Sequence, residues 1–359
     1  MKTSTRPALL ATAATGALLV AAASTASANV SPIVGHVFEA TNASSGNAIT
    51  VFDRHADGSL DRVTSVPTGG LGSGGSLHSQ GGVARDGRVV FVVNAGDDSV
   101  SALVATGHGL VLRDRIGSHG DFPVSVTVKD GVGYVLNQGS DTIQGFRYDD
   151  SGRLHPLPGS MRHLTPNPAG GTTDAAEVAF TPDGQNLVVT EKATNTLDTF
   201  AVDDGYAGRA RAHASAGATP YGFDFDARGH AIVSEAATGS ASSYRVRPFT
   251  TITAALGDTQ LAACWLVVAG NHAYVVNAAS TSVSSYTIAR DGSLTLAQAV
   301  AASTGAGPTD AALSADQGTL SVRLGDGSVT SFRIGADGSL GQGETATATA
   351  YGTAGLAAD

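Results

Sequence analysis

The chain has 359 residues, of which 31 are acidic and 21 are Lys or Arg, so its formal net charge is −10. An acidic chain with no basic cluster argues against binding to nucleic acid or to anionic membrane surfaces. Cys264 is the single cysteine, which excludes an intramolecular disulfide.

The first 28 residues have the pattern of a secretory signal peptide. Lys2 and Arg6 precede an apolar run, Ala8–Ala23, and the small residues Ala26-Ser27-Ala28 follow it. We therefore expect cleavage after Ala28, a secreted protein, and one mature domain over residues 29–359. The alternative is an uncleaved membrane anchor, which the shortness of the apolar run disfavours. Nothing later in the chain is long and apolar enough to span a membrane.

A strand–turn unit recurs along the rest of the chain. Its clearest copy is His272–Leu294, in which Val275-Val276-Asn277 leads to an alternating strand around Val283 and then to an Asp-Gly turn. The equivalent central strand residues are Ile49, Val100, Ile143, Leu197, Ala241, Val283 and Val329. Their spacings are 51, 43, 54, 44, 42 and 46 residues. Repeats of this length with several short strands each are typical of propeller blades, so the sequence predicts an all-β fold, a seven-bladed β-propeller of four-stranded antiparallel blades.

Each unit also carries an inner strand ahead of its Asn-containing strand. The expected inner strands are Ser79–Val83, Phe122–Val126, Glu177–Phe180, Tyr221–Phe225, Cys264–Val268 and Thr309–Leu313. The Asp-Gly pairs Asp86-Gly87, Asp130-Gly131 and Asp183-Gly184 should turn outward to the next strand as type I′-like hairpins.

The two ends of the chain complement each other. The final residues, Gly352–Asp359, resemble the start of a repeat, Gly81–Asp86, and the chain stops where the next strand should begin. The missing strand is present near the other end, at Gly35–Thr41. We therefore expect the C-terminal strand to become the inner strand of the N-terminal blade, which closes the ring without an open edge.

Two connections are long, Val66–His78 and His155–Thr173. Insertions in repeat proteins often lie on the binding face, although they can equally be tolerated surface loops.

The candidate catalytic residues come from comparing the repeats with one another. Six residues before each central position, the chain has Asn94, Asn137, Glu191, Glu235, Asn277 and Arg323. An Asn here can close a turn after the strand, so the departures from Asn are the better functional candidates. Glu191 and Glu235 fall in consecutive blades and should approach one another or the channel mouth. Two carboxylates can act as general acid and base or hold a cation; alternatively, both are solvated side chains at strand ends.

Other polar groups stand where inner strands begin. Asp174 and His78 are the candidates there, with Glu177 and Asp310 as possible further acidic ligands of a divalent cation in the channel. No HExxH, CxxCH, P-loop or dinucleotide fingerprint occurs, so no organic cofactor, zinc or haem is expected. Cys264-Trp265 fits a buried small residue beside a core aromatic.

The units FTPDGQNLVVTEKATNTLDTF, FDFDARGHAIVSEAATGSASSY and AYVVNAASTSVSSYTIARDGSL resemble the lactonase family of seven-bladed propellers, over nearly the whole mature chain. The resemblance implies the propeller fold and lactone hydrolysis. Glu235 matches a glutamate of the family's Asn-Glu step. Pro220-Tyr221-Gly222 stands where the family has Pro-Arg-His, and Thr173-Asp174-Ala175 stands where it has His-Pro-His. Pro308-Thr309 replaces a further Pro-Arg step.

Three hypotheses on function follow. In the first, a secreted hydrolase of a lactone or related ester uses Glu235 and Glu191 to activate water, and Arg323 or Lys192 stabilises the oxyanion. Tyr221, Asp174 and His78 would then contact the substrate. In the second, a non-catalytic extracellular propeller recognises a protein or glycan through its loops. In the third, Glu191, Glu235 and Asp174 hold a catalytic cation. We expect a monomer in each case.

Overall fold

The computed structural model describes residues 1–4, 31–107, 109–305, 307–347 and 355–359. Most of the predicted signal peptide, residues 5–28, lies outside the described residues. The chain divides into two units, Met1–Ser31 and Pro32–Asp359, and the second contains every strand described below. Within the described ranges, no helix is long and apolar enough to cross a membrane.

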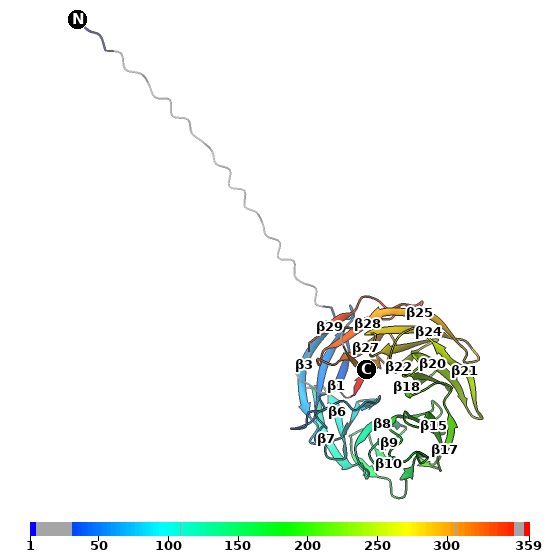
Figure 1. The fold of residues 1–359 in the computed structure, drawn as a ribbon. Helices are drawn as coiled ribbons and strands as arrows, with labels where there is room; N and C mark the ends of the chain where they lie inside the picture. Colours follow the sequence, from blue (N-terminus) through cyan, green and yellow to red (C-terminus); the bar gives the residue numbers. More distant parts are fainter. Residues whose placement is uncertain (5–30, 108, 306, 348–354) are drawn as a thin grey trace. The chain divides into compact units, whose positions relative to one another are not determined.

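Residues 32–359 form a seven-bladed β-propeller built entirely from antiparallel sheets, which confirms the predicted fold class. Figure 1 shows β8, β18 and β22 near the centre of the ring and β3, β7, β21 and β25 toward its rim. The innermost strands contact one another in the closed order β4, β8, β13, β18, β22, β26, β30 and back to β4. Each blade therefore packs on two neighbours around one axis.

The first four blades, in chain order, include the two whose outer strand is split into two short pieces. Their strands are β30 (Leu356–Ala358), β1 (Ile33–Ala40), β2 (Ala48–His55), β3 (Leu60–Pro67); β4 (Val83–Asp86), β5 (Val89–Asn94), β6 (Ser99–Thr106), β7 (Gly109–Gly117); β8 (Pro123–Lys129), β9 (Val132–Asn137), β10 (Thr142–Tyr148), β11 (Leu154–Pro156), β12 (Arg162–His163); and β13 (Ala175–Phe180), β14 (Asn186–Glu191), β15 (Thr196–Asp203), β16 (Tyr206–Ala207), β17 (Arg211–Ala214).

The last three blades have four strands each. These are β18 (Pro220–Phe225), β19 (His230–Glu235), β20 (Ser240–Val246), β21 (Phe249–Gly257); β22 (Ala263–Ala269), β23 (His272–Asn277), β24 (Ser282–Ile288), β25 (Leu294–Ser303); and β26 (Pro308–Leu313), β27 (Thr319–Leu324), β28 (Val329–Arg333), β29 (Glu344–Ala346).

The hydrophobic core follows the repeat found in the sequence. All seven central strand residues, from Ile49 to Val329, are at most 1% exposed. Apolar residues on the second and third strands of a blade face those of the next blade, so each pair of blades shares a core layer. Asp130 and Gly131 both have positive φ, 49° and 79°, as the expected type I′ turn requires. At Asp86-Gly87 and Asp183-Gly184 only the glycine has positive φ, so these two turns are not of the predicted type I′.

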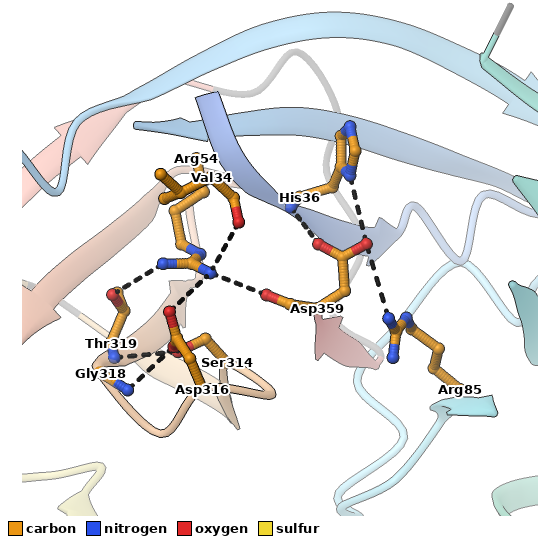
Figure 2. A network of polar contacts seen from close by, with 9 residues as sticks. All are labelled: Val34, His36, Arg54, Arg85, Ser314, Asp316, Gly318, Thr319 and Asp359. Atoms are coloured by element: carbon orange, nitrogen blue, oxygen red, sulfur yellow. Dashed lines mark hydrogen bonds and ion pairs between the residues drawn. The ribbon is translucent and has the colours of Figure 1, made fainter. Parts of the chain in front are cut away.

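The ring is closed by the C-terminal strand, as the sequence predicts. β30 pairs with β1, and Phe38 lies opposite Ala357 in the antiparallel register. The side chain of Asp359 then accepts hydrogen from the backbone N–H of His36 and lies 3.7 Å from an Nη of Arg85. Figure 2 shows Asp359 between these residues, with its backbone oxygen 2.9 Å from Arg54 Nη2. β30 follows β29 of the last blade along the chain but pairs with β1 of the first blade. This short strand therefore joins the last and first blades.

One expected inner strand begins later than predicted. The predicted strand starts at Ser79, but β4 begins at Val83, because the backbone groups of Gln80 and Gly81 bond to the inner strands of other blades, at Ala176 and Val126, instead of to β5. Gly81 has φ of +77°, a conformation that favours glycine and interrupts a strand. The backbone N–H of Gln80 donates to the carbonyl of Ala176, two blades away.

Deleting Leu356–Asp359 should lower the free energy of unfolding by roughly 3–5 kcal/mol, because it removes a buried leucine and several strand hydrogen bonds. Denaturant unfolding of the deletion variant and the full chain would measure this. Asp359→Asn is the matched control: it keeps the strand, so it should cost less than half as much. Equal stability of the deletion variant and the full chain would contradict closure by β30.

Candidate functional site

Four of the seven candidate residues come together where the inner strands begin. Lys192 follows β14, and its Nζ lies 3.2 Å from Asp174 Oδ1 and donates to the carbonyl of His78 at 2.5 Å. The same Nζ lies 5.0 Å from the ring centroid of Tyr221, the second residue of the next inner strand, β18. We call Asp174, Lys192, Tyr221 and the His78 carbonyl the entry group.

The entry group combines a covered cation with an accessible carboxylate. The side chain of Lys192 is 6% exposed, whereas that of Asp174 is 50% exposed. Burial lowers the pKa of Lys192, and the Asp174 carboxylate opposes that shift. Of the three donors on the ammonium, the carbonyl and the carboxylate take two, which leaves the third for another acceptor.

Aromatic side chains pack against one another beside the Lys192 ammonium of the entry group. The ring of Tyr221 meets Trp265 edge to face at a centroid distance of 5.5 Å, and Trp265 Nε1 donates to the carbonyl of Ser79. Cys264 and Trp265 are buried, as predicted from the sequence. Burial raises the pKa of the Cys264 thiol to about 12, so this sulfur stays protonated at neutral pH.

Glu191 lies inside its own blade. It is 0% exposed, and Thr194 Oγ1 donates to its Oε2 at 2.7 Å. Burial raises the pKa of Glu191 to about 9, and the nearby carboxylates of Asp198 and Asp141 add to that shift. Asp198 in turn accepts from the backbone N–H and the hydroxyl of Thr165. Burial and the neighbouring carboxylates thus favour the protonated form of Glu191, whose Oε1 is buried without a hydrogen-bond partner in the described part of the chain.

Glu235 is enclosed in the next blade by different partners. Its Oε1 accepts from Ser215 Oγ at 2.7 Å, Tyr244 Oη at 3.2 Å and the N–H of Gly217 at 3.3 Å. Burial raises the pKa of Glu235 as well. Among the described residues, no interaction joins Glu235 to Glu191, so the structure does not bring the two carboxyl groups together. Both are fully covered by protein.

The asparagines at the same repeat position show what this column does structurally. Asn94 Nδ2 donates to the hydroxyls of Ser99 and Ser101, and Asn277 Nδ2 donates to those of Ser282 and Ser284. The side chain ties the second strand of a blade to the third, rather than only closing the turn. Glu191 and Glu235 occupy this same position within their blades.

Arg323 lies in a separate buried ion pair. Its Nε donates to Glu39 Oε1 at 2.6 Å, and its Nη1 donates to Thr309 Oγ1 at 3.1 Å. Both charged side chains are at most 2% exposed. This pair links β27 of the last blade to β1 of the closing blade. In the described part of the chain nothing connects Arg323 to the entry group.

Sequence reasoning missed Gln80, which crosses the axis of the ring. Its Nε2 donates to the carbonyl of Leu266 at 2.8 Å, and its Oε1 accepts from the N–H of the same residue. A Cβ on Gly222 would lie 2.1 Å from that Oε1. Gly222 stands where the resemblance places the family's histidine, so the glycine makes room for Gln80. The sequence contains a signal for this interruption of the strand: Gln80 stands between Ser79 and two glycines at an expected strand start.

Acidic groups near the axis serve as hydrogen-bond acceptors between blades. Glu177 accepts from the N–H of Phe223 at 2.7 Å, and Asp310 accepts from the N–H of Leu356 at 2.9 Å. Burial raises the pKa of Asp310 to about 7 and that of Glu177 well above its ordinary value. Among the described residues, no three His, Cys, Asp or Glu side chains form a group that could hold a metal ion.

The fold and the entry group define a propeller with a polar site at one end of its axis. The family model for the lactonase seven-bladed β-propeller matches residues 45–167 and 160–263, so the chain belongs to that family. No curated protein matches the chain.

Solved structures of low sequence identity share the fold. A candidate 6-phosphogluconolactonase of Bacteroides uniformis is 15% identical with a TM-score of 0.72, over 89% of this chain and 98% of that one. The periplasmic gluconolactonase of Pseudomonas aeruginosa is 17% identical with a TM-score of 0.67, over 90% and 98%. At such identity the likeness concerns the fold.

Replacing Glu191 by Gln should change how stability depends on pH. The pKa of Glu191 rises from 4.5 to about 9 on folding, so the folded state binds the proton more tightly. Its contribution to stability is therefore present at low pH and is lost as pH rises from about 4.5 toward 9. We expect the free energy of unfolding of the wild type to fall more steeply between pH 5 and 9 than that of Glu191→Gln.

Unfolding in denaturant at several pH values would test this, with Glu344→Gln, a change at an exposed glutamate, as the control. The control should follow the wild type. Parallel curves for the wild type and Glu191→Gln would show that Glu191 is ionised in the fold.

Proposed function

We propose that this propeller hydrolyses an uncharged lactone or related ester at the entry group. The observation that carries the proposal is the position of Lys192: a covered ammonium held by two partners, over an aromatic ring and beside an accessible carboxylate. A buried cation with one unused donor can stabilise a developing oxyanion. Membership of the lactonase family supports lactone chemistry rather than another reaction.

The roles of the residues follow from their positions. Asp174 accepts a proton from water, and the water oxygen attacks the carbonyl carbon of the lactone. The carbonyl oxygen becomes negative and accepts hydrogen from Lys192 Nζ. Collapse of the tetrahedral intermediate breaks the ring C–O bond, and Asp174 returns its proton to the leaving alkoxide. The product is a hydroxy acid. Tyr221 is 6% exposed, so its ring supports the Lys192 ammonium rather than contacting the substrate.

The charges of the entry group favour an uncharged substrate. Asp174 and Lys192 cancel one another, and the family's Arg and His are replaced here by Tyr221 and Gly222. A phosphate or carboxylate on the substrate would therefore meet one cation that is already paired. In this proposal Glu191 and Glu235 hold strands in place rather than touch the substrate, which differs from the roles predicted for them. We further propose that the protein acts outside the cytoplasm, as a monomer, after removal of residues 1–28.

The second candidate is a non-catalytic extracellular propeller that binds a protein or glycan. Two observations favour it: Gln80 occupies the axis of the ring, and both glutamates are enclosed. Such a protein would use its surface loops and would not turn over a substrate. Hydrolysis assays distinguish the two candidates directly.

Purified protein lacking residues 1–28 should hydrolyse uncharged γ- and δ-lactones faster than phosphorylated sugar lactones. Lys192→Met keeps the length of the side chain and removes the oxyanion donor, so kcat should fall by about 10²–10³-fold. Asp174→Asn should remove the base and cause a comparable loss. A panel of lactones assayed by pH-stat would measure both.

Glu344→Gln is the control for these assays and should retain full activity. Circular dichroism and thermal melting would verify that each variant is folded. If the folded wild type hydrolyses none of the panel, or if Lys192→Met leaves turnover unchanged, the proposal fails. The first of these results would favour the binding protein.

A further inference from the structure

A basic groove lies between the blades formed by β13–β17 and β18–β21. It consists of two adjoining clefts of about 520 and 380 Å³, which share Asn186, Val246 and Arg247 as walls. We call it the arginine groove. Its cationic lining residues are Arg211, Arg228, Arg245 and Arg247.

The arginine groove is distinct from the entry group. Asp174 and Lys192 lie at the start of β13 and just after the end of β14, whereas the groove includes Asp183, from the turn that joins these two strands at their other ends. Antiparallel neighbours place those two positions at opposite ends of the blade. A ligand in the groove would therefore sit on the far side of the ring from the entry group.

The groove is positive although the chain is acidic. Four guanidinium groups line it, against the single carboxylate of Asp183, in a chain of net charge −10. That carboxylate already accepts from Thr181 Oγ1 at 2.6 Å and from the N–H of Gln185 at 3.0 Å. Arg228 and Arg245 are exposed, and their guanidinium groups donate to no acceptor in the described part of the chain. Their planar donors are thus available to an anion.

An aromatic platform adjoins these arginines. His213 stacks on Phe249 with ring centroids 3.9 Å apart and an interplanar angle of 11°. Phe249 stacks in turn on the buried ring of Tyr244, at 5.3 Å. His213 and Phe249 are partly exposed and both line the smaller cleft. The C–H face of a sugar ring can pack on a flat, rigid surface of this kind.

A second arginine-lined cleft on the rim differs in both respects. It holds Arg88, Arg113 and Arg153, but two carboxylates, Asp114 and Asp150, offset their charge. Its lining contains no aromatic residue. Arginine substitutions in the two clefts can therefore separate the effect of arginine alone from that of arginine beside an aromatic platform.

We propose that the arginine groove binds a short carboxylated oligosaccharide, a chain of uronate-type sugars. Guanidinium groups pair with carboxylates through two parallel hydrogen bonds, and the platform receives a sugar ring. The elongated shape suits a few linked sugars. A nucleic acid fits less well, because its affinity comes from contacts to many phosphates, and the groove offers four cations on an acidic surface. This proposal does not rest on lactone hydrolysis.

The test is isothermal titration of the full chain with a galacturonate trimer. We expect saturable binding that weakens as salt rises from about 50 to 200 mM, because ion pairs are screened. The double variant R245Q/R247Q should bind roughly tenfold more weakly or worse, since each lost charged hydrogen-bonding pair has about that effect. The matched control R88Q/R113Q should bind like the wild type. All four substituted arginines are exposed surface residues, and melting curves would show that each variant is folded.

Three further probes identify the ligand class: a glucose trimer, inorganic phosphate and a trinucleotide. The proposal predicts that the galacturonate trimer binds at least tenfold more tightly than each of them. It is overturned if the wild type does not bind the galacturonate trimer, if the uncharged trimer binds equally well, if the trinucleotide binds more tightly, or if R245Q/R247Q keeps the wild-type affinity.

Discussion

The free edge of each innermost strand is the constraint on which the propeller depends. Such a strand pairs with one neighbour only, so its other backbone N–H groups, buried near the axis, need acceptors. Side chains of adjacent blades supply them: Glu177 accepts from Phe223, and Asp224 accepts from Val268 at 2.9 Å. Burial raises the pKa of Asp224 to about 6. Acidic residues near the axis are thus explained by strand edges, without a cation.

The need for acceptors at the strand edges also explains which residues lie at the axis, and the entry group lies at one end of that axis. Gln80 satisfies the strand edge at Leu266 from across the ring, and Gly222 provides the space that it needs. The segment before Gln80 also presents the His78 carbonyl that holds Lys192. The residue that fills the axis therefore sits two positions from a partner of the cation in the entry group. The segment from His78 to Gln80 therefore serves both the packing at the axis and the entry group, so substitutions in it would affect both.

The fold could be predicted from the sequence because its signals are periodic. Seven copies of one strand pattern, with central residues such as Ile49 and Val329, predict blades, and the incomplete unit before Asp359 predicts closure. The site was harder, because the pattern of one repeat shows where a residue lies along a strand but not which partners it meets. Glu191 and Glu235 depart from Asn, yet each stays inside its blade. The partner of Glu191 could have been noticed: Asp198 stands where other repeats have serine, such as Ser101 and Ser284. Glu39 pairs with Arg323, which lies 284 residues further along the chain, and nothing in the repeat pattern indicates this partner.

The most direct test of the entry group as a catalytic site is a crystal structure with a lactam, the slowly hydrolysed analogue of a lactone. A lactam has the same ring and carbonyl oxygen but resists attack by water. Our account predicts that its carbonyl oxygen lies within hydrogen-bonding distance of Lys192 Nζ, with a water molecule held by Asp174. A lactam bound elsewhere, or bound at the entry group with its carbonyl directed away from Lys192, would contradict the account.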